Sequence, residues 1–144
     1  MRARCKPVPL PGKRPGCLFP DGNVWGVSNT RNDATYAGAV WKIGANGFSL
    51  KHSFSGGADG YQPNGPLLLA ADGDLYGTTL AGGNAEGPGG NGVVFRMTPK
   101  GEFKIVHRFE GLDDGSAPTG SLAVDESGRI YGGTQSGTVF QITP

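Results

Sequence analysis

The stretch that decides the fold runs from Asp72 to Thr79 and reads DGDLYGTT. It returns as SGRIYGGT at 127–134 and, more loosely, as DGNVWGVS at 21–28. A second element follows each copy: GAVWKI at 38–43, GVVFRM at 92–97 and GTVFQI at 137–142. Corresponding glycines of the three copies are 51 and 55 residues apart, about the length of a kelch-type propeller blade. The chain is therefore predicted to be an array of about three similar units.

Each unit divides into four short strands, which the middle copy places at 74–79, 93–98, 102–109 and 121–124. Turn dipeptides such as Asn46-Gly47 and Asp72-Gly73 mark tight hairpins between strands two and three and between strands four and one, because these residues accept a positive φ. The other two connections are long. Alternate connections of a meander lie at opposite ends of the sheet, so one end is predicted to carry the tight turns and the other the long loops.

The predicted fold class is all-β: a β-propeller-type array of about three four-stranded antiparallel blades, incomplete because closed propellers usually have four to eight blades. A Pro-rich arm at 1–16 precedes one repeat domain at 17–144, with repeats near 17–65, 66–120 and 121–144. Three explanations stay open: a piece of a longer protein, copies that associate to close a ring, or an open array. We favour the piece, because an open array should end in polar caps and 139–142 reads VFQI.

Composition narrows the class of protein. Thirteen basic and twelve acidic residues give a net charge of +1, which argues against a nucleic-acid partner. No run approaches the ~20 apolar residues of a membrane span, and the N-terminus has no apolar segment typical of a signal peptide. Cys5 and Cys17 could close a small disulfide loop in an oxidising compartment.

Aromatic and histidine residues recur at fixed places in the units. Large rings in strands one and two are predicted to pack between neighbouring sheets; they are Trp25, Tyr76, Tyr131, Trp41, Phe95 and Phe140. Strand three alternates, with Phe48, Leu50, His52 and Phe54 on one side. His52 and His107 are repeat-equivalent and so rotated apart, which favours hydrogen-bonded packing over a shared catalytic or metal site. No catalytic residue, cofactor or metal site is predicted.

The long loops hold the candidate ligand-binding side chains, because scaffolds usually bind where their loops vary. The connection between strands one and two has nine residues in the first unit, twelve in the second and two in the third. Hydrogen-bonding and stacking groups suited to sugars or peptides are Arg31, Asn32, Asp33, Tyr36, Asp59, Tyr61, Asn84, Glu86, Asn91, Asp113 and Asp114. Solvated loops without a ligand are the alternative.

Two other interpretations of these loops are weaker. A calcium loop needs several oxygen ligands at close spacing, which only Asp72-Gly73-Asp74 and the pair Asp113-Asp114 approach. The glycine-rich segment 82–92 lacks the Gly-Lys-Ser/Thr ending of a phosphate-binding loop. Asp beside Gly is ordinary turn chemistry, since the carboxylate can accept a hydrogen bond from its own backbone two residues on.

The repeat pattern DG-x-LYGTT, GG, G-x-VF, a Phe-ended strand and DG-x-x-P closely resembles the GloVer tandem repeat of choice-of-anchor bacterial proteins. The resemblance covers residues 21–144 and is strongest from Asp72 to Phe140. It implies a propeller-like repeat protein that is secreted or displayed on the cell surface, and it carries no catalytic residues with it. Val27-Ser28 replaces Thr-Thr in the first copy, and the Gly-Gly loop is missing from the last.

These observations lead us to expect a non-catalytic module that binds a glycan or a protein through the long-loop face, with self-association or further blades closing the ring. One alternative is a fragment of a propeller hydrolase or lyase whose catalytic groups are shared with other blades. A purely structural spacer is another. Repetition favours binding, since it multiplies equivalent weak contacts, whereas catalysis needs one site unlike its neighbours.

Overall fold

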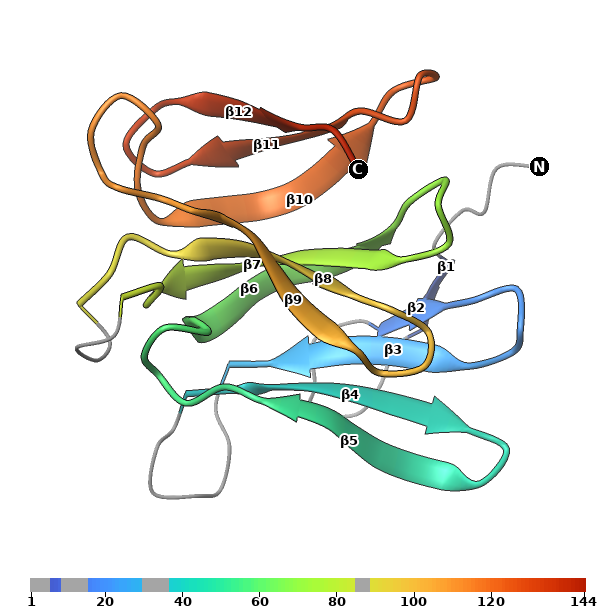
Figure 1. The fold of residues 1–144 in the computed structure, drawn as a ribbon. Coiled ribbons are helices and arrows are strands. Elements are labelled where there is room, and N and C mark those ends of the chain that lie inside the picture. Colours follow the sequence, from blue (N-terminus) through green and yellow to red (C-terminus); the bar gives the residue numbers. More distant parts are fainter. Residues whose placement is uncertain (1–5, 9–15, 30–36, 85–88) are drawn as a thin grey trace.

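The computed structural model describes residues 6–8, 16–29, 37–84 and 89–144, which form strands joined by turns and loops (Figure 1). The strands in chain order are β1 (Lys6–Val8), β2 (Gly16–Leu18), β3 (Val24–Ser28), β4 (Ala39–Gly44), β5 (Gly47–Ser53), β6 (Tyr61–Leu69), β7 (Leu75–Ala81), β8 (Val93–Met97), β9 (Phe103–Arg108), β10 (Pro118–Val124), β11 (Ile130–Thr134) and β12 (Val139–Ile142). Within these ranges there is no helix long and apolar enough to span a membrane. Cys5, and with it the predicted pairing to Cys17, lies outside the described residues.

Three antiparallel sheets lie one above another (Figure 1). Their strand orders are β1-β2-β3-β4-β5, β6-β7-β8-β9 and β10-β11-β12. Neighbouring strands in each sheet are consecutive in the chain, so each sheet is a simple meander. The predicted all-β array of about three blade-like sheets is confirmed. The first sheet has a fifth strand because β1, which belongs to the predicted Pro-rich arm, pairs with β2.

Strands β6 and β10 begin earlier than the sequence indicated. Both start in segments rich in Gly and Pro that predict a loop, and the predicted repeat boundaries at 65/66 and 120/121 fall inside them. Each strand carries a break in register against its partner, between Asn64 and Leu68 in β6 and between Thr119 and Ala123 in β10. A β-bulge interrupts the pairing locally and accommodates glycine. Because pairing resumes on the other side of the bulge, each Gly-containing segment is part of one strand.

The tight hairpins form at one end of the sheets, as predicted. In the β6–β7 turn, Gly73 has φ +86°, and its N–H donates to the carbonyl of Ala70 at 3.1 Å. The Asp72 carboxylate accepts from the Asp74 backbone N–H at 3.0 Å and from the Tyr76 hydroxyl at 2.8 Å. The Asp-Gly pair therefore closes the turn with its own backbone and anchors the ring of the following strand.

The largest core cluster joins the first and second sheets. It includes Trp25, Phe54, Phe95 and Met97, each at most 2% exposed. The glycine after each strand-one aromatic has a packing reason: a Cβ on Gly77 would lie 2.4 Å from the ring of Phe95. The same clash arises at Gly26 with Trp41 and at Gly132 with Phe140, both at 2.3 Å, so the motif needs glycine where a ring of the neighbouring strand crosses it.

The predicted packing of strand three holds in β9 and differs in β5. Phe103 and Ile105 of β9 pack against the core shared with the first sheet. Their equivalents in β5, Phe48 and Leu50, are 58% and 42% exposed, because no described strand covers their face of the first sheet. The recurring rings of the third sheet, Tyr131 and Phe140, are also only half-buried. The equivalent rings of the first two sheets are buried as predicted; they are Trp25, Trp41, Tyr76 and Phe95.

Candidate functional site: the long-loop face

The long connections 54–60 and 109–117 lie at the end of the sheets opposite the tight turns, together with the described residues 82–84 and 89–92 of the connection between β7 and β8 (Figure 1). The short β11–β12 turn, 135–138, lies at the same end. Main-chain hydrogen bonds tie neighbouring loops to one another. The N–H of Gly83 donates to the carbonyl of Gly57 at 2.8 Å, and that of Ala117 donates to the carbonyl of Asn91 at 2.8 Å. The face is thus a set of linked loops on a rigid sheet scaffold.

His52, at the end of β5, anchors the first of these loops. Its Nε2 lies 3.0 Å from Oδ2 of Asp59. The same carboxylate accepts the backbone N–H of Ser55 at 3.1 and 3.0 Å and also accepts the Ser55 hydroxyl. The imidazole is stacked on the ring of Phe103 from the second sheet, with centroids 3.7 Å apart. One side chain thereby joins a loop, its own strand and the neighbouring sheet.

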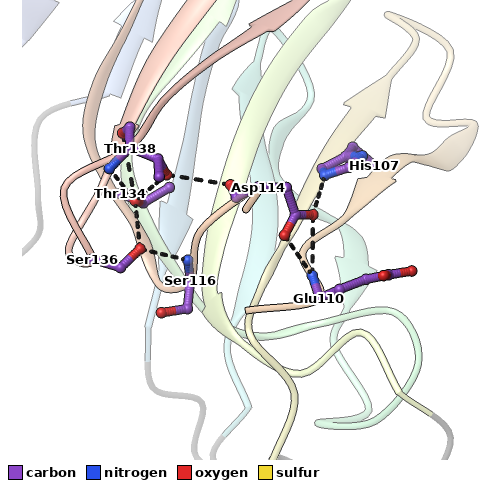
Figure 2. A network of polar contacts seen from close by, with 7 residues as sticks. All are labelled: His107, Glu110, Asp114, Ser116, Thr134, Ser136 and Thr138. Atoms are coloured by element: carbon purple, nitrogen blue, oxygen red, sulfur yellow. Dashed lines mark hydrogen bonds and ion pairs between the residues drawn. The ribbon is translucent and has the colours of Figure 1, made fainter. Parts of the chain in front are cut away.

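The second unit repeats this arrangement (Figure 2). His107 Nε2 lies 3.0 Å from Oδ2 of Asp114, whose two carboxylate oxygens accept the backbone N–H of Glu110 at 3.2 and 3.1 Å. In both units the aspartate is seven residues after the histidine and belongs to the repeated Asp-Gly of the loop. We call this arrangement the His–Asp clasp.

The protonation of the clasps follows from their surroundings. Burial lowers the pKa of His52 and outweighs the hydrogen bond and the charge of Asp59, which raise it. Burial raises the pKa of Asp114, but hydrogen bonds from the Glu110 backbone and from His107 outweigh it and hold that pKa below its ordinary value. The first clasp therefore favours a neutral histidine beside its carboxylate.

A hydroxyl cluster holds the loop of the second clasp from its other side (Figure 2). The hydroxyls of Thr134 and Ser136 are 2.9 Å apart, and those of Thr134 and Thr138 are 2.7 Å apart. The backbone N–H of Ser116 donates to the Ser136 hydroxyl at 2.9 Å. The Thr138 hydroxyl donates to the main-chain carbonyl of Asp114 at 3.3 Å. Asp114 thus joins the cluster through its carbonyl and the histidine through its carboxylate.

This geometry fits a structural role for the clasps. Nucleophilic catalysis by a His–Asp pair needs a hydroxyl or thiol at the other ring nitrogen. The cluster hydroxyls instead bond to one another and to the backbone of the loop. Among the described residues, no group of three His, Cys, Asp or Glu side chains is placed to hold a metal ion.

The residues predicted to bind a ligand differ in their burial and in their hydrogen bonds. Asp59 and Asp114 are engaged in the clasps, and Asn91 is half-buried with its carbonyl holding Ala117. Tyr61 is half-buried at the start of β6, whereas Asn84 and Asp113 are exposed. The others lie outside the described residues; they are Arg31, Asn32, Asp33, Tyr36 and Glu86.

The sequence reasoning did not identify the hydroxyl cluster, although the recurrence of one threonine in the motif pointed to part of it. Thr79 and Thr134 close the two clearest copies of the motif. The Thr79 hydroxyl donates to the carbonyl of Ala81 at 2.9 Å and accepts the N–H of Val93 at 3.2 Å. A Cβ on Gly60 would lie 2.7 Å from Thr79. The threonine (Thr79 or Thr134) and the Asp-Gly pair of the loop both recur in these two units, and the recurrence of both indicates that they are in contact.

Comparison with known proteins gives a family and a fold. The family model of the Gloeobacter/Verrucomicrobia repeat matches residues 12–144. A streptogramin B lyase structure matches 88% of this chain and 38% of its own, with a TM-score of 0.52 and 14% identity. A catalytically inactive virginiamycin B lyase from Staphylococcus aureus, with quinupristin, matches 97% of this chain and 45% of its own, with a TM-score of 0.54 and 19% identity. The chain thus spans less than half of these structures, and the likeness shows the fold alone. None of the curated proteins compared with the chain matches it.

Proposed function

Because the chain belongs to the Gloeobacter/Verrucomicrobia repeat family, we propose that it is a non-catalytic recognition module that binds a glycan or a protein through its long-loop face. The parent protein is proposed to be bacterial and either secreted or displayed at the cell surface. The proposal of binding rests on the equivalent loop supports and on the variable loops that they carry, and the proposed origin and location rest on the repeat family.

The observation that carries the proposal is a contrast between two kinds of loop on the same face. The loops 54–60 and 109–117 are fixed by equivalent His–Asp clasps with the same distance of 3.0 Å. The connections 29–38, 82–92 and 135–138 differ in length from unit to unit. A rigid support with variable loops is the usual arrangement of a binding surface.

The exposed groups on this face include polar side chains suited to hydrogen bonding with a sugar or a peptide backbone, and one large apolar side chain, Leu112, which is 77% exposed. Asn84 and Asp113 are exposed, whereas Tyr61, the first residue of β6, is half-buried and packs against the core cluster. The amide and the carboxylate offer both hydrogen-bond donors and acceptors. The bonds within the clasps support the non-catalytic part of the proposal, since they leave the aspartates occupied by the loop backbone.

The proposal is tested with a variant that shortens one loop. Residues 84–89 are replaced by Ser-Gly, which keeps the Gly83 and Asn91 backbone contacts. The chain and the variant are screened against bacterial and plant glycans and against surface proteins. Lys100→Ala is the matched control, because Lys100 is exposed in a tight turn at the opposite end.

We expect the loop variant to lose at least about tenfold in affinity for whatever ligand the chain retains, and Lys100→Ala to bind as the chain does. As a folding control, the free energy of unfolding of each variant should lie within about 0.5 kcal/mol of that of the chain. Equal binding by all three proteins would contradict the assignment of the long-loop face.

A further inference from the structure

The sequence contains three Asn-Gly pairs, at 46–47, 64–65 and 91–92. Such a pair is chemically labile, because the backbone nitrogen of the glycine can attack the side-chain amide carbon of the asparagine and no Cβ on the glycine blocks the approach. The attack needs an amide that is free to turn toward the main chain and a nitrogen that is not held elsewhere. The surroundings of the three pairs therefore decide which one reacts.

The pair Asn91-Gly92 is held on the long-loop face. The N–H of Gly92 donates to the carbonyl of Gly82 at 3.0 Å, and the carbonyl of Asn91 accepts the N–H of Ala117 at 2.8 Å. The side chain of Asn91 is enclosed as well, since a Cβ on Gly111 would lie 2.7 Å from its Nδ2. The attacking nitrogen of this pair is thus engaged in a hydrogen bond, and its target amide is packed against a neighbouring loop.

The pair Asn64-Gly65 lies in the bulge of β6, beside β10 of the third sheet. Asn64 is half-buried, and its Nδ2 donates to the hydroxyl of Thr119 at 3.1 Å. Its main-chain carbonyl accepts the hydroxyl of Thr78 at 3.0 Å. Gly65 packs so closely that a Cβ there would lie 2.3 Å from the carbonyl oxygen of Gly120. Both the amide and the residue that follows it are thus fixed between two sheets.

The pair Asn46-Gly47 differs, because it lies at the turn between β4 and β5, at the end of the first sheet that carries the tight turns (Figure 1). Both residues are exposed, and a Cβ on Gly47 would meet no atom within 4 Å. Gly47 pairs with Gly44 in the last rung of the hairpin, and the end of a ladder opens more readily than its middle. The pair therefore combines an exposed amide with a backbone that the opening of a single rung releases.

We propose that Asn46 is a site of spontaneous covalent modification, at which the chain deamidates before it does so at Asn64 or Asn91. The nitrogen of Gly47 forms a bond to Cγ of Asn46 while the bond from Cγ to Nδ2 breaks, and ammonia leaves with the proton of the Gly47 N–H. Water then opens the resulting cyclic imide at one of its two carbonyls, which yields aspartate or isoaspartate at position 46. Water is the only co-reactant, and the inference is independent of the proposed function.

The two products differ in their effect on the hairpin of β4 and β5. Aspartate keeps the main chain as it is and adds a negative charge to an exposed turn. Isoaspartate adds one methylene to the main chain between the paired strands, and the register of a hairpin is set by its turn. Isoaspartate should therefore loosen the last rungs, such as the pair Ile43 and Phe48, while His52 at the other end of β5 keeps its clasp.

The experiment incubates the folded chain and the urea-unfolded chain at neutral pH in heavy-oxygen water, so that each deamidation adds one heavy oxygen. Trypsin, in ordinary water, then separates residues 43–51, which contain Asn46, from residues 52–96, which contain the other two pairs. Fragment-ion spectra distinguish Asn64 from Asn91. In the folded chain we expect conversion at Asn46 to be at least about tenfold faster than at the other two, because those react only after local opening. In urea the three rates should converge.

Matched variants separate the site from its surroundings. Asn46→Gln should abolish the early conversion and leave the two slow sites unchanged. Thr119→Ala removes the partner of the Asn64 amide and should speed conversion at Asn64 alone. Earlier conversion at Asn64 or Asn91, equal rates at the three sites of the folded chain, or no conversion at Asn46 while the unfolded chain converts would overturn the proposal.

Discussion

Replacing Phe103 by alanine tests how one unit holds the next. Phe103 is half-buried and stacks on His52 at 3.7 Å while it packs against Phe54 and Phe95. A fully buried phenylalanine costs about 3–5 kcal/mol when truncated to alanine. The half-buried ring should cost about 2 kcal/mol, which lowers the Tm of a chain of this size by about 6 °C.

Phe48→Ala is the matched control, because the same position of the first unit is 58% exposed. It should cost less than about 1 kcal/mol. Urea unfolding followed by tryptophan fluorescence measures both variants, since Trp25 lies in the cluster that Phe103 adjoins. A second readout follows from the stacking: without Phe103, His52 is less buried, and its pKa should rise toward the ordinary value. Equal destabilisation by the two variants would refute the packing of the second sheet on the first through β9.

Three further predictions concern single residues. The pKa of His52 is lower in the folded chain than in the unfolded one, so the contribution of His52 to stability should be complete above the unfolded pKa of about 6.5 and should fall as the pH drops below it. Urea unfolding at a series of pH values measures this dependence, and His52→Gln should remove it. A pH profile that is the same in the variant and in the chain would contradict the prediction. Burial and the hydrogen bond to Asp72 raise the pKa of Tyr76 to about 12, so a spectrophotometric titration should show one tyrosine ionising last, and that ionisation should vanish in Tyr76→Phe. Gly77→Ala should cost about 1–3 kcal/mol in the same unfolding assay, because the new Cβ would meet Phe95 at 2.4 Å; a neutral result would show that the ring can move aside.

The architecture could be predicted because the repeated residues, such as the Asp-Gly pairs, determine the conformation of the backbone close to them. Asp-Gly pairs impose turns through backbone conformation, and Gly73 adopts the expected positive φ. The equivalent positions of His52 and His107 in two repeats predicted separate hydrogen-bonded residues and no shared site, and each imidazole is hydrogen-bonded to its own aspartate. These features depend on neighbours within a few residues, which a single sequence displays.

What could not be predicted depends on which particular groups the fold brings into contact. Asp59 and Asp114 looked like ligand-binding or turn residues, and only the fold shows that each reaches back to a histidine seven residues earlier. The exposure of Phe48 also follows from the absence of a described sheet over it, since the same position in β9 packs on a neighbour. Sequence periodicity gives the face on which a residue lies but not whether another sheet covers it.

The measurement that tests the central claim most directly is isothermal calorimetry of the chain and of its loop-shortened variant with the ligand identified by the screen. The account predicts saturable binding by the chain and a loss of at least about tenfold in the variant, with equal unfolding midpoints for the two proteins. Unchanged affinity in a folded variant would contradict the claim that the long-loop face is the recognition surface.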